Sequence, residues 1–504
     1  MRPPSLAIKY LAKKHARKLE EIQNNPSLTQ KKVLDNIKEI FSQTKWDSKF
    51  RISEISSPRA LAEEFKNTSD TDYDDMILKI REQNTPGAIQ QGPLEYMAKT
   101  SGSTAKSKYI PYPKSLIKNF QRFSFETFLH FSHSRAVYNL MQGYLLVSPS
   151  NLTTERNDCG IHIGTGTGIM TSLAPKFTRS IVRPSLKNLN HNSFEEKIDA
   201  MVKEAINLDI RSFTCAPAFA VPILEHLFNE AQKSKREVKD ILDIWPNLKF
   251  YSFSGSSVIP YERTLRSFLG DKIPFLEIYS ATESPIAYQY DPNRPGELYL
   301  DLESCFFLFQ KEGTQNDSRR FNISELEVGS RYRLLITTYG GLINYELGDI
   351  IEVTSLKPVL IKIIGREKEE ANIAGTERLS LATIREHLNW VFDKYGLSID
   401  QYFLSSYTDD DGKIGYLWTF ETDQTISNDL ISDLDTNLMK LNSGYKASRD
   451  SDVRLRPPKV ITIPKDSIRR YILEHKSFGQ GKFLVVHNDN KDVDLFFAWL
   501  NNRK

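Results

Sequence analysis

Apolar residues recur at helical spacing in the first part of the chain. Residues 5–25 predict an amphipathic helix ending near residues 24–26, because charged residues surround apolar ones at Leu6, Tyr10, Leu11, Leu19 and Ile22. A second helix is predicted over residues 31–41. A longer one is predicted after Thr104, where apolar residues follow at spacings of four and three at Leu116, Phe120 and Phe123.

Short apolar runs then alternate with helical segments. Ser193 and Glu196 form the S-x-x-E pattern of a helix start, and the residues behind them place one apolar face at Phe194, Ile198, Met201 and Ala205. Strands are predicted over residues 144–147, 249–253, 274–279, 331–338, 350–353 and 359–364. This alternation predicts an α/β fold class.

The character of the chain changes after Arg366, where residues 365–378 are highly charged. Beyond them the pattern predicts a helix, strands over residues 402–407 and 415–420, another helix, and a final helix before Phe478. We therefore expect a large N-terminal α/β domain over residues 1–366. A smaller, mobile α+β domain is expected over residues 367–504.

The composition narrows the class of protein. Lys and Arg total 67 against 64 Asp and Glu, and the charges are interspersed, so nothing demands a nucleic-acid partner. No apolar run reaches the ~18–20 residues that cross a bilayer. The cysteines lie far apart, without metal-binding spacing, at Cys159, Cys215 and Cys305. We expect a cytoplasmic protein without a membrane or nucleic-acid partner.

Two segments carry residue types suited to phosphate groups. Residues 100–108 place hydroxyl groups around one glycine and end in lysines, which can donate several hydrogen bonds to phosphate oxygens. They lack the G-x-x-x-x-G-K-[ST] pattern of P-loop enzymes, and a polar surface turn is the alternative. Thr282 and Glu283 follow a predicted strand, where Glu283 could hold Mg²⁺, although a helix cap is the alternative.

Two later segments carry further polar groups. Asp349, expected at a turn, could accept hydrogen bonds from both ribose hydroxyls, and Arg366 could bridge ribose and phosphate. A β-turn with a surface arginine is the alternative. Residues 479–482 form a glycine-containing loop that displays Lys482, and alone they are typical of a turn.

Taken together and in this order, the four segments resemble the adenylate-forming (acyl-activating) enzyme superfamily. The likeness is greatest to the auxin-responsive acyl acid–amido synthetase family of plants and its bacterial relatives. It extends from about residue 50 to residue 482, and it includes the run from Trp245 to Lys249 that leads to Ser254-Gly255-Ser256. The chain differs in having Ala105 where the wider superfamily often has glycine.

The resemblance implies a role for each matching residue. The β- and γ-phosphates of ATP would be held around Gly102 by Ser101, Ser103 and Thr104, assisted by Lys106 or Lys108. Adenine would be bordered by Gly255, Ser256 and Tyr279. The catalytic residues would be Thr282 at the α-phosphate, Glu283 as the magnesium ligand, and Lys482. Asp349 would hold the ribose and Arg366 would mark the hinge.

The same resemblance implies the reaction. In the N-terminal domain, a carboxylic acid would attack Mg·ATP, release pyrophosphate and form an acyl adenylate, and an amine, expected to be that of an amino acid, would then form an amide. Coenzyme A as a thiol acceptor is one alternative. A nucleotide-binding regulatory protein without turnover is another.

We do not assign the two remaining patterns to nucleotide binding or metal binding. Residues 164–168 read G-x-G-x-G rather than G-x-G-x-x-G, with no clear helix after them, so we expect a loop near the acyl pocket or a plain structural segment. His130 and His133 share a helical face without a nearby third ligand, and we expect them to pack in the core.

Overall fold

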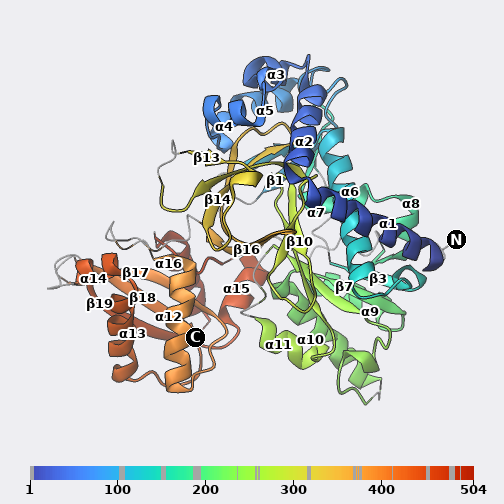
Figure 1. Cartoon of the computed structure of the whole chain (residues 1–504). Helices are drawn as coiled ribbons and strands as arrows, with labels where there is room; N and C mark the ends of the chain where they lie inside the picture. The colour runs from blue at the N-terminus through green and yellow to red at the C-terminus, as the bar shows by residue number, and fades with distance from the viewer. Residues whose placement is uncertain are drawn as a thin grey trace. The chain divides into compact units, whose positions relative to one another are not determined.

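The structure is a computed structural model, and it divides into two compact units (Figure 1). It describes residues 5–100, 108–148, 155–185, 194–234, 237–255, 258, 261–314, 319–366, 371, 373, 377, 379–410, 413–449, 455–475, 483–488 and 490–503. The N-terminal unit comprises Met1–Leu347, Ile351–Ile363 and Phe478–Gln480. The C-terminal unit comprises Gly348–Ile350, Ile364–Ser477 and Gly481–Lys504. The expected functional division after Arg366 stays a prediction.

The chain begins with a group of helices. These are α1 (Ser5–Asn24), α2 (Pro26–Phe41), α3 (Lys45–Phe50), α4 (Pro58–Glu64) and α5 (Asp74–Gln83). The first two helices are confirmed, but the predicted face of α1 is wrong in part, because Leu6 and Tyr10 are exposed. Its buried face instead has regular spacings of four and three at Ile8, Ala12, His15, Leu19 and Ile22, so a small and a polar residue belong to the core side.

A long mixed sheet forms the body of the N-terminal unit, in the order β13-β12-β14-β15-β16-β11-β10-β9-β8-β7-β3-β6. Strands β6, β3, β7, β8 and β9 pair in parallel, and β10 joins β9 antiparallel. The strands at this end are β3 (Tyr144–Val147), β6 (Val182–Arg183), β7 (Ile210–Thr214), β8 (Phe250–Ser254), β9 (Phe275–Ser280) and β10 (Pro285–Gln289). The others are β11 (Leu298–Leu300), β12 (Cys305–Lys311), β13 (Arg320–Phe321), β14 (Arg331–Thr338), β15 (Tyr345–Leu356) and β16 (Val359–Arg366).

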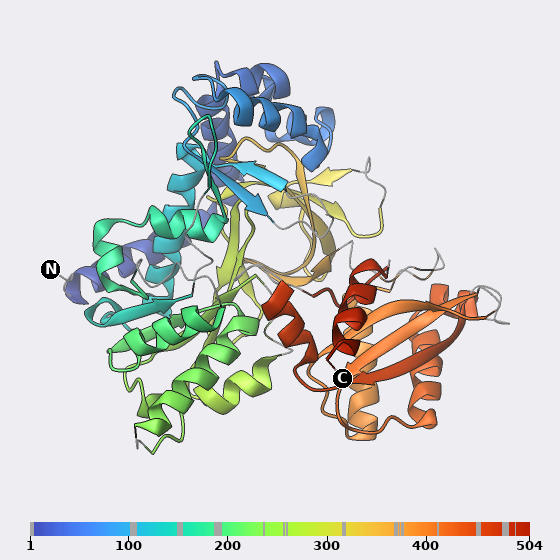
Figure 2. The ribbon, with the colours of Figure 1, turned by 180° about the vertical axis from the view of Figure 1, so that it is seen from behind.

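Helices accompany the parallel strands, as expected for an α/β fold, and the predicted fold class is confirmed. Helices α9 (Phe194–Ala205), α10 (Pro217–Lys233) and α11 (Glu262–Leu269) lie together next to these strands (Figures 1 and 2). The predicted apolar face of α9 is buried at Ile198, Met201 and Ala205. Ser193, the expected helix cap, lies outside the described residues.

A small sheet in the order β2-β1-β5-β4 completes the N-terminal unit. Its strands are β1 (Tyr96–Thr100), β2 (Lys108–Pro111), β4 (Glu155–Arg156) and β5 (His162–Gly164), and the adjacent helices are α6 (Lys114–Ser134) and α7 (Gly166–Ser172). Helix α8 (Lys176–Ile181) instead contacts β6 of the long sheet. Leu116 and Phe120 of α6 pack with Ala98, Ile110 and Ile169. Two residues of the apolar face predicted for α6 therefore join this sheet to α7, and the third, Phe123, packs in a separate cluster.

The C-terminal unit is α+β, built on the sheet β17-β18-β19. Its elements are α12 (Leu381–Tyr395), β17 (Tyr402–Thr408), β18 (Ile414–Glu421), α13 (Asn428–Leu441), α14 (Ser443–Arg449), β19 (Arg456–Ile463), α15 (Ser467–His475) and α16 (Lys491–Asn501). The two predicted strands are confirmed, but the helix before Phe478 is not the last, because α16 follows it. Strand β19 begins Arg-Pro-Pro, a sequence that an edge strand tolerates because prolines need not donate to the ladder.

Among the described residues, no helix is both long and apolar enough to cross a membrane.

Candidate active site

The carboxyl ends of the parallel strands form the edge where α/β sheets bind ligands. Ser254 of β8 pairs with Ile278 of β9, so the two strands end at the same edge. Gly255 follows β8 with φ +86°, which favours glycine, and Thr282 and Glu283 lie just beyond β9. The structure therefore places three of the expected site residues at this edge.

Thr282 and Glu283 lie in a tight connection between two strands. The backbone N–H of Ala281 donates to the carbonyl oxygen of Ser284 at 3.0 Å, and β10 begins at Pro285. The helix cap considered as the alternative is therefore wrong, because a strand follows. The connection is supported by Tyr112 on β2's C-terminal side, whose hydroxyl donates to the Thr282 carbonyl oxygen at 2.9 Å.

The glycine run after β5 approaches this connection closely. A Cβ on Gly166 would lie 2.5 Å from the Tyr112 hydroxyl and 3.7 Å from Cγ2 of Thr282, so the close approach requires glycine. We expected no clear helix after the run, and this expectation is wrong. Helix α7 begins within the run, and the Thr165 side chain caps it by accepting a hydrogen bond from the Gly168 N–H. The run therefore lies beside the expected α-phosphate residue.

The first predicted segment is held at its two ends. Thr100 of β1 and Lys108 of β2 are register partners, so the chain leaves and re-enters the small sheet at one place. The intervening residues Ser101, Gly102, Ser103, Thr104 and Lys106 lie outside the described residues, and their phosphate contacts stay predictions.

A chain of polar contacts joins three of the predicted segments. The ammonium of Lys108 forms an ion pair with Asp70 Oδ2, and the hydroxyl of Tyr345 donates to Asp70 Oδ1. That hydroxyl also lies 3.3 Å from Oε1 of Glu283. Residues after the first segment, beyond β9 and at the start of β15 therefore meet around one carboxylate, Asp70, which sequence reasoning missed.

Electrostatics keep the two tyrosines of this cluster protonated. Burial raises the pKa of Tyr345, and the negative charges of Glu283 and Asp70 raise it further. Burial also raises the pKa of Tyr112, with a further contribution from Glu283. Both hydroxyls are therefore hydrogen-bond donors at neutral pH.

The cluster fits a magnesium ion that is shared with phosphate groups. Mg²⁺ commonly takes one or two carboxylates and completes its shell with substrate phosphates and water. Glu283 supplies one carboxylate next to the strand edge, and the described residues contain no group of three His, Cys, Asp or Glu side chains that could form an all-protein cage. Glu283 would be a residue that holds such an ion.

The remaining predicted residues have mixed outcomes. Tyr279 lies in β9, 8% exposed, within the main hydrophobic cluster. Asp349 is 3% exposed and lies inside β15 rather than at a turn, because the strand continues through Gly348 at φ +76°. Arg366 ends β16. Ser256 and Lys482 lie outside the described residues.

Two titratable side chains are buried near the same edge. Cys215 directly follows β7, and burial raises the pKa of its thiol to about 12. Lys197 on α9 is 1% exposed, and burial lowers its pKa to about 8. A thiol protonated at neutral pH is a poor nucleophile, so the arrangement does not favour thiolate chemistry at Cys215.

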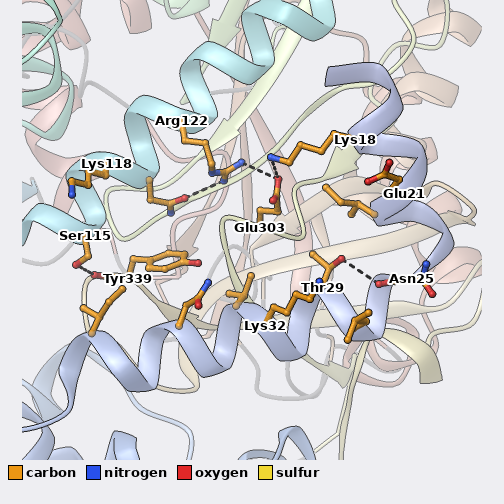
Figure 3. A pocket seen from close by; sticks show the side chains of 16 residues that line it. Lys18, Glu21, Asn25, Thr29, Lys32, Ser115, Lys118, Arg122, Glu303 and Tyr339 are labelled. Atoms are coloured by element: carbon orange, nitrogen blue, oxygen red, sulfur yellow. Dashed lines mark hydrogen bonds and ion pairs between the residues drawn. The ribbon is translucent and has the colours of Figure 1, made fainter. Parts of the chain in front are cut away.

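A separate polar cavity of about 810 Å³ lies between α1, α2 and α6 (Figure 3). It is lined by none of the predicted site residues. Three of its lining residues belong to an ion network, in which Lys18 contacts Glu303 at 2.6 Å and Arg122 contacts Asp301, outside the lining, at 2.7 Å. These pairs satisfy much of the charge that faces the cavity.

Comparisons with known proteins agree on one family. Residues 15–197 match the GH3 family N-terminal domain, residues 298–366 its central domain and residues 384–491 its C-terminal domain, which together cover more than half of the chain. The indole-3-acetic acid-amido synthetase GH3.10 of Arabidopsis thaliana is 33% identical over 132 residues, 23% of this chain and 22% of that protein. The jasmonoyl–L-amino acid synthetase GH3.5 of Oryza sativa subsp. japonica is 27% identical over 194 residues, 32% of each chain. The aligned parts thus span a third or less of these relatives.

Solved structures extend the likeness to nearly the whole fold. The GH3.15 acyl acid amido synthetase superposes with a TM-score of 0.78 at 14% identity, covering 95% of this chain and 94% of that one. A 2-hydroxyisobutyryl-CoA ligase in the postadenylation state gives a TM-score of 0.54 at 12% identity, covering 93% and 91%. From its matches to all three family domains, the chain belongs to the GH3 family.

Proposed function

We propose that the protein is an AMP-forming ligase that activates a carboxylic acid with ATP. It forms an acyl adenylate, releases pyrophosphate, and transfers the acyl group to the amine of an amino acid, which gives an amide. The observation that carries the proposal is the meeting of Lys108, Glu283 and Tyr345 around Asp70 at the ligand-binding edge of the sheet. The GH3 domains and the names of the amido synthetase relatives support the same activity.

The chemistry explains why these residue types belong together. Attack of a carboxylate on the α-phosphate concentrates negative charge on the phosphate oxygens, and aimed donors stabilise that charge. Lys108 and the hydroxyl groups of Ser101, Ser103 and Thr104 supply donors, and Thr282 lies next to the α-phosphate. Glu283 would hold the Mg²⁺ that accompanies ATP, and the ion would neutralise part of this charge. Gly255, Ser256 and Tyr279 border adenine, and Asp349 holds the ribose.

The proposal also specifies which group accepts the acyl group in the second step. The name of the Oryza sativa relative specifies an amino acid and that of the Arabidopsis thaliana relative an amide product, which favours an amine acceptor. Coenzyme A is the second candidate, because a CoA ligase shares the fold. A cytoplasmic location remains part of this proposal.

Product identification tests the proposal. The protein is incubated with Mg·ATP, a panel of carboxylic acids, and either mixed amino acids or coenzyme A, and products are identified by mass spectrometry. We expect AMP, pyrophosphate and an acyl–amino acid amide. A thioester product would show that coenzyme A rather than an amino acid is the acceptor. Nucleotide binding without pyrophosphate release for any acid would contradict the proposed enzymatic activity.

A further inference from the structure

The hydroxyl of Tyr112 contacts two segments from distant parts of the chain. It donates a hydrogen bond of 2.9 Å to the carbonyl oxygen of Thr282, 170 positions further along. Next to it lies Gly166, where an added Cβ would be 2.5 Å from the hydroxyl oxygen. The hydroxyl therefore lies against both the connection after β9 and the first residue of α7.

The ring that carries this hydroxyl is held in place. Tyr112 is 2% exposed, and its ring stacks on that of Phe120 in α6, with the centroids 5.7 Å apart. Its backbone N–H donates to the Tyr96 carbonyl oxygen of β1 at 3.0 Å. Because the backbone and the ring are both packed, the hydroxyl cannot move aside without disturbing the core.

Helix α7 is held on the same small sheet. Ile169, fully buried, packs in one cluster with Ala98, Ile110 and Tyr112. Gly166 is the first residue of this helix, a conformation that alanine adopts more readily than glycine does. The glycine is therefore required by the approach of the tyrosine hydroxyl and not by the backbone.

The carbonyl oxygen that Tyr112 contacts belongs to the peptide unit that joins Thr282 to Glu283. A peptide unit is planar and rigid, so a hydrogen bond that holds its oxygen also limits the backbone rotation of both residues. Thr282 is expected at the α-phosphate and Glu283 at the magnesium ion. One hydroxyl thus acts on the two side chains that the proposed adenylation requires at this edge.

We propose that Tyr112 is a positioning residue that holds the peptide between Thr282 and Glu283 in the orientation needed for adenylation. Position 166 is glycine so that the tyrosine hydroxyl can reach that peptide. The inference rests on the proposed function, because it concerns the same site. It gives a role to the glycine run of residues 164–168, which the expected nucleotide contacts do not include.

Carboxylate-dependent ATP–pyrophosphate exchange tests the role of the hydroxyl. Tyr112→Phe keeps the ring, and we expect it to lower kcat by ~10–100-fold, the scale of misplacing a reacting group by about 1 Å. The affinity for ATP, measured by calorimetry without a carboxylic acid, is expected to stay close to that of the wild type, because the other nucleotide contacts remain. A purely structural role would instead lower the unfolding temperature and leave kcat of the folded protein unchanged.

Gly166→Ala tests the steric part of the proposal. Its Cβ would displace the hydroxyl from Thr282, so the variant is expected to lose about as much kcat as Tyr112→Phe. In the double variant the added Cβ would meet the ring carbon Cζ at 3.5 Å, an ordinary contact. We therefore expect no further loss in the double variant, whereas two independent effects would multiply.

Tyr109→Phe and Gly92→Ala are the matched controls. The Tyr109 ring, on β2, lies against the Arg81 guanidinium at 3.9 Å. No atom of the described residues lies within 4 Å of a Cβ added at Gly92. Both control variants are expected to exchange at the wild-type rate.

The possible results have distinct meanings. Wild-type kcat in a folded Tyr112→Phe or Gly166→Ala protein would overturn the proposal. So would a loss in the double variant equal to the product of the two single losses. Absence of exchange in the wild-type protein with every acid would instead overturn the proposed function, and this inference with it.

Discussion

His130 shows how burial sets the charge of a single residue. It lies on α6, 8% exposed, with Nε2 at 2.7 Å from the Tyr290 carbonyl oxygen and its ring against Tyr288. Burial lowers its pKa to about 4, and the nearby His15 and His133 also oppose a positive charge. The ring is therefore neutral and donates from Nε2, and its expected packing in the core is confirmed.

This burial makes stability depend on pH in a defined direction. Between pH 6.5 and 4 the unfolded chain binds a proton at His130 that the folded chain does not, so stability is lost as pH falls through that range. The loss is worth about 1.4 kcal/mol for each unit of pKa difference. We expect thermal unfolding of His130→Gln to show a smaller fall in Tm from pH 7 to pH 4.5 than the wild type.

His133, one turn along the same helix, is only half-buried. The control for this experiment is Ser134→Ala, an exposed position on the same helix whose side chain does not titrate. It is expected to keep the wild-type pH dependence. An identical fall in Tm for wild type and His130→Gln would contradict the assignment.

At the scale of elements, the turn between β14 and β15 shows how a glycine allows the backbone to pack closely against a helix side chain. Gly341 has φ +94°, and its carbonyl oxygen accepts from the buried Trp46 indole N–H at 2.9 Å. A Cβ there would lie 2.6 Å from that indole nitrogen. The turn therefore anchors α3 to the main sheet only while position 341 is glycine.

Gly341→Ala is expected to lower the free energy of unfolding by about 2–4 kcal/mol, because it combines a strained backbone with a steric clash. Gly329→Ala is the matched control, since its φ is +80° but no atom lies within 4 Å of the added Cβ. It should cost only about 1–2 kcal/mol. Urea unfolding followed by tryptophan fluorescence measures both, and equal costs would contradict the role of the clash.

Some strands of the main sheet were predicted from their local sequence, and others were not. Strands β3 and β14 have the predicted bounds; β3 is a continuous apolar run, and β14 contains one over residues 334–336. The strands β10, β11 and β12 were missed, although β12 is almost wholly buried. Strand β11 has three residues and β10 begins at a proline, so only pairing with neighbours makes them strands.

At the scale of the whole molecule, the proposed reaction uses residues from both ends of the chain. Lys482 carries the ammonium expected to act in adenylation. Lys482→Ala is expected to lower carboxylate-dependent ATP–pyrophosphate exchange by ~10²–10³, the scale of losing one aimed transition-state donor.

Lys465→Ala, an exposed lysine before α15, serves as the control and is expected to exchange at the wild-type rate. Exchange retained in full by Lys482→Ala would remove that residue from the mechanism. Measuring transfer from a preformed acyl adenylate in the same variant assigns any loss to the first or the second step.

Local sequence patterns were sufficient to predict the helices with regular apolar spacing and the α/β class. They also gave the order of the four segments that carry candidate site residues. Those features depend on neighbours within a few turns, which a sequence displays directly. The meeting of Asp70 with Tyr345, 275 positions away, and of Tyr345 with Glu283, 62 positions away, required the fold. Such contacts are created by strand pairing and packing between distant segments, and no local pattern around Asp70 distinguishes it from a surface acid that starts a turn.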